Sequence, residues 1–273
     1  AYTFGLCLGD IVGWNHSLYP EYNSIMDSTG IDWRNVMGNH DMTNYGRSFE
    51  GSTRDYEKMY GPSYYSFNVG KVHYIVLNNN FYVGKDWYYI GYLTEQQLSW
   101  MEKDLSYVGK DKKVVVSLHI PTTLREWDRT GYNFNFSHIA DVMCNRKAVY
   151  DILAPYDALI LSGHTHTGNN EIIAENLMEH NVTSLGGAWW CGPICVDGGP
   201  AGYKIYNFDG TDVKWRFAGC DTGENCQMKV YWDAESFPGE AVANVWDYDP
   251  QWKVEYFEDG VKVCDMKRFE GKD

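Results

Sequence analysis

The stretch DALILSGHTHTGNN, residues 157–170, contains the pattern that decides the fold. Its apolar run at residues 158–161 is short and is bounded by an aspartate and a glycine, which is typical of a buried β-strand. Alternate side chains of an extended chain point the same way, so His164 and His166 share one side of the segment after this strand. Two imidazoles at a strand end either hold a metal ion or pack as loop residues, and this stretch alone favours neither.

The composition is that of a folded protein, with 44% hydrophobic and 22% charged residues among 273. No apolar run approaches the roughly 20 residues that span a bilayer, so we expect no membrane-spanning segment. The formal net charge of −14 argues against nonspecific binding to nucleic acid or to anionic membranes. It leaves phosphate substrates open, because metal ions reverse the local potential of an acidic site.

Seven cysteines are an odd number, so at least one has no partner within the chain. Cys191 and Cys195 form one close pair and Cys220 and Cys226 another, both in glycine-rich loops. Two alternatives stand at this point: small disulfides, or free thiols in a reducing compartment. Neither spacing is the two-residue gap typical of a zinc knuckle.

Strand-like and helix-like segments alternate from residue 1 to about residue 165, which predicts an α/β layered fold. We expect strands at three places: the opening AYTFGLCLGD, the residues before GNHD, and the segment KKVVVSLHIP. The segment YYSFNVGKVHYIVLNN predicts a hairpin that turns at residues 68–71. The segment LTEQQLSWMEKDLSYV predicts a helix, with Thr94 and Gln97 as a capping box, and a further helix is expected to end before Pro155.

The character of the chain changes after about residue 185, where a glycine-rich loop precedes a hairpin with an Asp-Gly turn. The following segments alternate apolar and polar residues without a helical period. We therefore expect an α/β domain at residues 1–221 and a small all-β module at residues 222–273, and we expect that module to be incomplete.

Polar side chains follow four of the predicted strands at the point where each strand ends. They are Asp10, the group Asn39, His40 and Asp41, then His119, and the pair His164 and His166. Ligand sites of open α/β sheets lie at the carboxyl ends of the strands, where loops converge. The four groups are therefore expected to meet, which favours a metal site.

The ordered motifs GD, GNHD, a lone histidine and GHTH resemble those of the calcineurin-like metallophosphoesterase superfamily over roughly residues 1–170. The resemblance implies a sandwich of two sheets flanked by helices, in the layer order α/β/β/α, with the β module appended. It also implies hydrolysis of a small phosphorylated substrate at two divalent transition-metal ions, either Mn, Fe or Zn. The substrate is expected to be a phosphomonoester, a phosphodiester or a pyrophosphate.

The resemblance assigns a role to each motif residue. It implies that Asp10 bridges the two ions, that Asn39, His119 and His164 complete one metal site, and that His166 contributes to the other. A metal-bound hydroxide would attack phosphorus. His40 would stabilise the phosphoryl group and protonate the leaving oxygen, and Asp41 would orient it.

One family motif, D-x-H, is absent from these 273 residues. In the family that motif lies on a strand upstream of GD, which here falls before Ala1. We expect that a preceding segment supplies it. Without it, one metal site is expected to be incomplete and the activity of this chain low or absent.

Several other residues carry two readings each. His16 either touches substrate or lies in a surface loop, and the asparagines at 78–80 either line the pocket or make a turn. The segment after His119 is either a lid or a solvated loop. Trp189 and Trp190 either stack on an organic leaving group or seal the β module against the core. The polar candidates of the segment after His119 are Arg125, Arg129 and His138.

Two further classes of function compete with hydrolysis. One is a binding or scaffold protein that has the same fold but no catalytic activity. The presence of the proton donor His40 argues against it, because a protein without activity does not need this residue. The other is carbohydrate or cell-wall binding through the β module, with Trp232, Trp246 and Trp252 as a platform; alternating aromatics also form sandwich cores. The appended module resembles that of exported bacterial relatives, so we expect an extracytoplasmic location, with a cytoplasmic one as the alternative.

Overall fold

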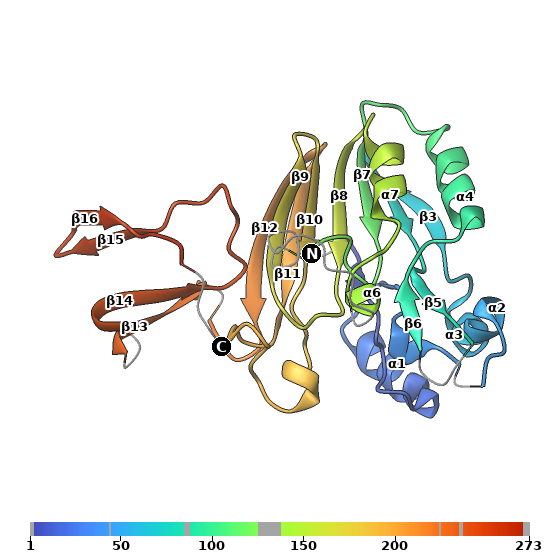
Figure 1. Ribbon diagram of the computed structural model, residues 1–273, viewed down its shortest axis with the longest axis horizontal. Helices are drawn as coiled ribbons and strands as arrows, with labels where there is room; N and C mark the ends of the chain where they lie inside the picture. Colours follow the sequence, from blue (N-terminus) through green and yellow to red (C-terminus); the bar gives the residue numbers. More distant parts are fainter. Residues whose placement is uncertain are drawn as a thin grey trace.

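The computed structural model describes residues 3–43, 45–84, 88–124, 138–223, 225–234 and 237–269. They contain a six-stranded sheet of β3 (Tyr65–Val69), β4 (Val72–Val76), β7 (Lys113–Ser117), β8 (Asp157–Ser162), β9 (Asn169–Ala174) and β10 (Leu177–Asn181). The strand order is β3-β4-β7-β8-β10-β9 (Figure 1). The inner four strands are parallel, and β3 and β9 pair antiparallel at the two edges.

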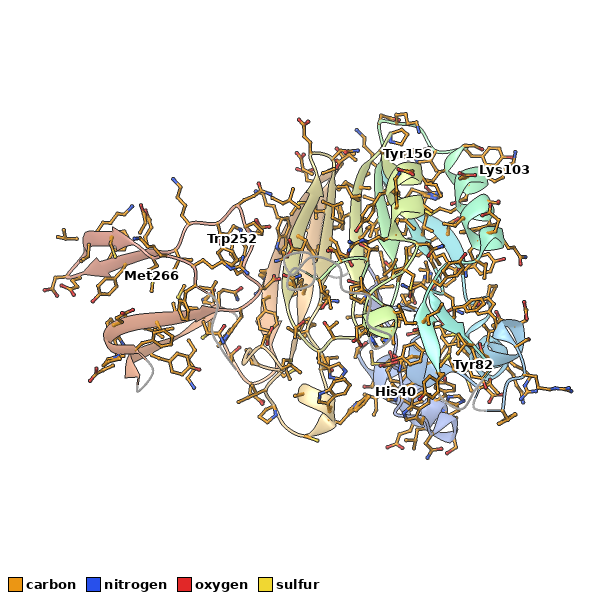
Figure 2. The ribbon with its side chains drawn as sticks, in the orientation of Figure 1. His40, Tyr82, Lys103, Tyr156, Trp252 and Met266 are labelled. Atoms are coloured by element: carbon orange, nitrogen blue, oxygen red, sulfur yellow. The ribbon has the colours of Figure 1, made fainter. Side chains whose placement is uncertain are left out.

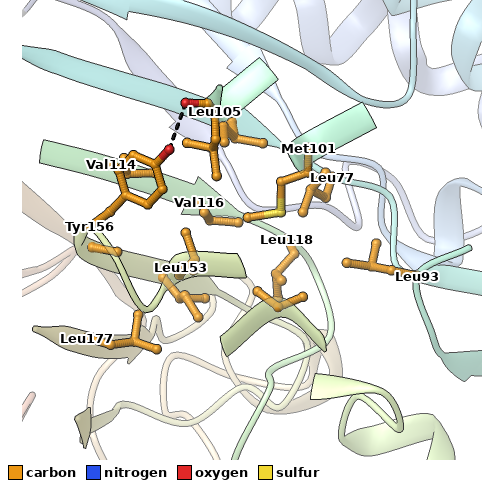
Figure 3. Packing of buried hydrophobic residues seen from close by; sticks show 14 of the residues in the cluster. Leu77, Leu93, Met101, Leu105, Val114, Val116, Leu118, Leu153, Tyr156 and Leu177 are labelled. Carbon is orange, nitrogen blue, oxygen red and sulfur yellow. Dashed lines mark hydrogen bonds between the residues drawn. The ribbon is translucent and has the colours of Figure 1, made fainter. Parts of the chain in front are cut away.

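The inner strands β4, β7 and β8 are buried on both faces and mostly apolar, as expected of parallel strands that are covered on both sides. On one face, side chains such as Ile75, Val116 and Ile160 pack under α4 (Glu95–Leu105) and α7 (Arg146–Leu153). Figure 3 shows this cluster, which the Tyr156 hydroxyl closes by donating to the backbone oxygen of Leu105 at 2.7 Å. This is the helical layer that the fold requires.

The opposite face of the sheet is covered by further strands. Tyr74, Val115 and Leu159 pack there against Leu6 and Tyr206. Two small sheets supply these contacts: β1 (Gly5–Cys7) parallel to β2 (Trp33–Asn35), and the hairpin of β11 (Gly202–Asp209) and β12 (Asp212–Gly219). The two β-layers form the predicted sandwich.

A second helical layer lies outside β1 and β2. Tyr22 of α1 (Tyr19–Ser28) donates its hydroxyl to Asn35 Oδ1 at 3.4 Å, and Tyr56 of α3 (Arg54–Tyr60) donates to the Asn35 backbone oxygen at 2.7 Å. The predicted layer order α/β/β/α is therefore confirmed. The remaining elements of this part are α2 (Phe49–Ser52), β5 (Asn80–Tyr82), β6 (Tyr89–Gly91), α6 (His138–Asp141) and short 3₁₀ turns at His16–Leu18, Asn39–Asp41 and Ala188–Trp190.

The C-terminal part consists of two hairpins that extend away from the sandwich (Figure 1). They are β13 (Met228–Ala234) with β14 (Phe237–Val245), and β15 (Glu255–Glu258) with β16 (Val261–Asp265). Trp246 is buried and packs against Phe217 of β12 at 6.1 Å between ring centroids, whereas the Trp232 side chain is 62% exposed. Trp246 is thus a core residue, and the three tryptophans considered for a carbohydrate platform do not share one exposed surface.

The predicted capping box of α4 is only half correct. Thr94 Oγ1 accepts from the Gln97 backbone N–H at 3.3 Å, as predicted. The Gln97 side chain does not return to Thr94; it is buried and bonds to the backbone N–H and oxygen of Asn78, at 3.0 and 2.8 Å. Those two groups lie past the end of β4, where no neighbouring strand pairs with them, so the amide is recruited there.

Two sequence-level questions are answered by the described residues. All seven cysteines lie among them and are free thiols, so neither close pair is joined. Among the helices of the described ranges, none combines the length and the apolar character that a membrane crossing requires. The lid considered after His119, with Arg125 and Arg129, lies outside the described residues, as does the side chain of His138.

Candidate active site

The motif residues follow strands at their carboxyl ends. Asp10 comes after β1 and the turn Asn39–Asp41 after β2, while His119 and His164 each lie two residues beyond β7 and β8. β1 and β2 are parallel, and so are β7 and β8, so the ends of each pair lie side by side. Figure 2 shows His40 near Tyr82 at this end of the molecule, far from Trp252 and Met266.

His119 is at the centre of the cluster. Its Nε2 atom lies 3.0 Å from Asn39 Oδ1, 3.2 Å from His164 Nδ1 and 3.3 Å from Asp10 Oδ1. One ligand atom each of Asp10, His119 and His164 lies within 4.8 Å of the others. Donor atoms from three distant segments therefore come together at the Nε2 atom of His119.

The backbone fixes which nitrogen of His119 faces these donor atoms. Its Nδ1 atom lies 2.7 Å from the backbone oxygen of Leu8, and because a carbonyl only accepts, Nδ1 carries the proton. The Nε2 lone pair is left for the cluster. Gly9 makes the approach possible: its φ of 102° favours glycine, and a Cβ there would lie 2.5 Å from His119 Nδ1.

The donor set fits a divalent cation. Two nitrogen ligands at about 2.0–2.1 Å from one ion lie about 3.0–3.4 Å apart. The 3.2 Å between His119 Nε2 and His164 Nδ1 falls in that range. A carboxylate, an amide oxygen and two imidazoles together suit Mn, Fe or Zn. The second nitrogen of His164 faces Asp141 Oδ1 at 3.8 Å, as outer carboxylates commonly orient ligating histidines.

Burial and neighbouring charge set the protonation of the cluster. Burial alone would raise the pKa of Asp10, but His119, His40 and His164 hold that pKa well below its usual range. Burial lowers the pKa of His164, which favours its neutral form. Burial acts in the same direction on His119, but the Asp10 carboxylate outweighs it and raises the pKa. Asp10 is therefore the ionised anchor of the cluster.

His166 lies beside this cluster rather than in it. Its Nδ1 atom is 2.6 Å from the backbone oxygen of Gly187, so Nδ1 carries the proton and Nε2 keeps its lone pair. The Trp189 N–H lies 3.3 Å from the same nitrogen, which cannot accept from it while Nδ1 carries the proton. His166 is buried, and its ring stacks on Trp189 at 5.0 Å and 23°.

His40 has one ring nitrogen toward the cluster. Its Nε2 atom lies 3.9 Å from Asp10 Oδ2, and its backbone N–H donates to Asp10 Oδ1 at 2.9 Å. Its Nδ1 atom is buried and has no hydrogen-bond partner among the described residues. Burial lowers the pKa of His40. Trp14, which sequence reasoning did not single out, lies against the His40 ring at 4.1 Å between centroids.

The Asp41 carboxylate bonds to groups other than His40. It accepts from the backbone N–H groups of Gly38 and Ile11, at 2.8 and 3.3 Å, and from the Tyr19 hydroxyl at 3.1 Å. Its complete burial raises its pKa to about 7. No contact between this carboxylate and the His40 ring is found among the described residues; the carboxylate accepts from these three donors instead. Asp41 instead fixes the turn that carries His40.

The buried asparagines after β4 are structural rather than pocket-lining. Asn79 Oδ1 accepts from the backbone N–H groups of His119 and Ile120, at 3.2 and 3.1 Å, and its amide donates to the Ile120 oxygen at 2.6 Å. Asn79 thus fixes the backbone at His119. In the sequence, the run of asparagines at the end of the strand was the only signal of this role. His16 is also structural, since its ring bonds to the His40 backbone oxygen and to Asp55 at 3.1 and 3.4 Å.

The loop GGAWW, residues 186–190, closes over the histidines. The Trp190 ring meets His40 at 5.0 Å and His166 at 5.5 Å between centroids. The glycines permit this, because a Cβ at Gly186 would lie 2.8 Å from Trp190 Cδ1 and because Gly187 has a φ of 63°. Both tryptophans therefore lie at the site, not at the β module.

Left-handed backbone is concentrated at the site. Of the nine described non-glycine residues with positive φ, six are in or beside it. Such conformations cost free energy and persist where the surroundings enforce them, commonly at functional sites. They are Asp10, Trp14, His164, His166, Trp189 and Trp190.

A two-layered β-sandwich between helices, with metal-type ligands at its strand ends, defines a class of metal-binding α/β proteins. The model of the family "Calcineurin-like phosphoesterase" matches residues 3–168, and that of "C terminal of Calcineurin-like phosphoesterase" matches residues 179–273. The chain belongs to the calcineurin-like phosphoesterase family.

Individual relatives match smaller parts. Purple acid phosphatase 15 of Arabidopsis thaliana is 29% identical over 105 residues, which cover 38% of this chain and 17% of that protein. A dimetal phosphatase from Danio rerio aligns over 65% of this chain and 71% of its own, with 17% identity and a TM-score of 0.46. The purple acid phosphatase PPD1 of yellow lupin (Lupinus luteus) aligns over 65% and 36%, with 14% identity and a TM-score of 0.47.

Proposed function

We propose that this protein is a metal-dependent phosphoester hydrolase. The observation that carries the proposal is the convergence of Asp10, Asn39, His119 and His164 around one point, with the His119 tautomer already suited to ligation. Membership of the calcineurin-like phosphoesterase family supports it. The substrate is a small phosphorylated molecule, and the net charge of −14 speaks against nucleic acid as a partner.

The proposed metal ligands fall into two sets. Asp10, Asn39, His119 and His164 would hold one divalent ion, and Asp10 and His166 would contribute to a second. Bound there, the ions would polarise the phosphoryl oxygens and supply a water that loses its proton near neutral pH. For the proposed second ion, Asp10 and His166 are the only ligands that we identify among the described residues.

His40 is the proposed proton donor to the leaving oxygen. Its Nε2 atom faces Asp10 at 3.9 Å, next to the point where the ligands converge. Trp14 and Trp190 press on its ring from two directions, which restricts the ring to this orientation. Asp41 acts indirectly, since it holds the turn that carries His40 and shares no hydrogen bond with the ring.

Two wider proposals follow from the sequence patterns. We propose residues 1–221 as the catalytic domain and residues 222–273 as an appended β module. We also propose an extracytoplasmic location; the free thiols of the seven cysteines favour the cytoplasmic alternative.

The test is to strip the purified full chain of metal with a chelator and to restore Mn, Fe or Zn separately. We expect weak turnover of p-nitrophenyl phosphate or its bis-ester that depends on added metal, together with measurable metal content. The turnover is expected to be weak because the D-x-H motif is absent from these residues. Asp10→Asn should lower kcat/KM by about a hundredfold or more, because a metal ligand contributes several kcal/mol to charge stabilisation. Asp111→Asn, an exposed change away from the site, is the matched control. A rate of turnover that is unchanged by the chelator and by Asp10→Asn would refute the proposal.

A further inference from the structure

The metal binding and proton transfer proposed above leave the exposed faces of Trp189 and Trp190 without a use. Their side chains are 60% and 48% exposed, although one ring stacks on His166 and the other meets His40. Large apolar rings with free faces directly beside a reaction centre are unusual on a protein surface unless they bind something.

The loop that carries this surface is built to hold it in place. The Gly187 backbone oxygen accepts from His166 Nδ1 at 2.6 Å, so a proposed metal ligand and the loop are tied together. Trp190 packs over Gly186, and both tryptophans adopt left-handed backbone, with φ of 52° and 57°. A bulky residue enters that region only at a cost in free energy. In this loop, two consecutive residues adopt the unfavourable conformation.

The position of the surface identifies which part of a substrate it meets. His40 is the proposed proton donor to the leaving oxygen, and the Trp190 ring lies 5.0 Å from the His40 ring. A group attached to the leaving oxygen therefore extends over Trp190 and Trp189. The indoles carry no charge, so they bind the organic part of a substrate rather than its phosphate.

The orientation of the rings indicates the shape of that organic part. Trp189 lies at 23° to the His166 ring, so its outer face continues a nearly parallel stack. Flat rings add to such a stack, and a nucleobase on an aromatic side chain gains about 1–3 kcal/mol.

We propose that Trp189 and Trp190 are specificity-determining residues on which the flat ring of the leaving group stacks, so that the enzyme prefers nucleotides to phosphoesters without a ring. This inference rests on the proposed hydrolase function, and its test separates the two.

The experiment compares AMP with ribose 5-phosphate, which share the same leaving alkoxide and differ in the base. For the metal-loaded full chain we expect kcat/KM for AMP to exceed that for ribose 5-phosphate by about tenfold, the ratio that one stacked base gives. Trp189→Ala and Trp190→Ala should each lower this ratio toward one, and Trp189→Phe should restore much of it. Trp232→Ala, an exposed tryptophan on β13, should leave the ratio unchanged.

A second measurement does not depend on turnover. In the presence of a chelator, equilibrium titration should give AMP a lower Kd than ribose 5-phosphate, and Trp189→Ala should abolish the difference. Equal values for the two ligands in the wild-type protein, in Kd or in kcat/KM, would overturn the stacking surface while leaving the hydrolase proposal intact. A difference in Kd without any metal-dependent turnover would overturn the hydrolase and keep the surface.

Discussion

At the scale of single residues, a buried carboxyl group supports the site from behind. Glu179 on β10 is 1% exposed, and its Oε1 atom accepts from the Thr122 backbone N–H at 2.9 Å and the Ser162 hydroxyl at 2.7 Å. It thereby ties the chain beyond His119 to the end of β8. Burial raises the pKa of Glu179, since the ionised form loses its hydration there.

This raised pKa makes Glu179 a source of pH-dependent stability. The folded protein keeps a proton that the unfolded chain releases near pH 4.3, so the stabilisation is complete below that pH and is lost as the pH rises through the folded-state pKa. Glu179→Gln removes this dependence. We therefore expect the Tm of the variant, relative to wild type, to be higher at about pH 8 than at about pH 5. Glu102→Gln, exposed on α4, should give the same difference at both pH values. Parallel curves for Glu179→Gln would contradict the assignment.

At the scale of elements, the turn after β7 depends on one amide. Asn79 is fully buried and forms three hydrogen bonds to the backbone of His119 and Ile120. It thus joins the end of β4 to the end of β7 where the strand ladder has stopped. The position of His119, and hence of its Nε2 atom, rests on this side chain.

Asn79→Ala should therefore affect both folding and metal binding. The substitution leaves buried backbone groups without a hydrogen-bond partner, at about 1–3 kcal/mol for each group. We therefore expect the free energy of unfolding to fall by about 2–4 kcal/mol. Metal affinity should fall about 10–100-fold, as for other supports of a ligand. Asn176→Ala is the matched control, because its amide also caps a turn but water reaches it. A loss of stability with unchanged metal affinity would show that His119 is held by other contacts.

Local patterns predicted most elements, and long-range contacts explain the rest. The strands at 113–117 and 157–162 and the hairpin at 65–76 followed from apolar runs and turn residues, which act locally. The Gln97 side chain hydrogen-bonds to the backbone of Asn78 beyond the end of β4 instead of capping its own helix. The motif spacing indicated the cluster at His119, but the contact of GGAWW with His40 depends on tertiary packing that no periodicity encodes.

At the scale of the whole molecule, an ion pair joins the C-terminal hairpins to the sandwich. Lys204 of β11 pairs with Asp247, both almost completely buried, and its Nζ atom also donates to Asn170 Oδ1 at 2.6 Å. Burial lowers the pKa of Lys204. The segment between the C-terminal hairpins is therefore anchored in the core by Asp247, next to the buried Trp246.

Breaking this pair should destabilise the whole chain. Asp247→Ala leaves a buried ammonium unpaired, which we expect to cost about 3–5 kcal/mol in denaturant unfolding. The double variant Lys204→Met with Asp247→Leu should lose much less, because no charge remains to be desolvated. At temperatures well below Tm, metal-dependent kcat should be the same in all three proteins. A double variant as unstable as Asp247→Ala would mean that packing, not charge, makes this junction.

The proposed metal ligands are brought together only by the completed fold. His119 contacts Leu8 and Asn39 across 111 and 80 positions of the chain. Contacts of that separation require long loops to close and form after the local hairpins and helices. A cation held at this point therefore finds no binding site in the unfolded chain or in an early intermediate. Its binding slows the escape from the native state and leaves the rate of reaching it unchanged, so metal loading protects the protein kinetically.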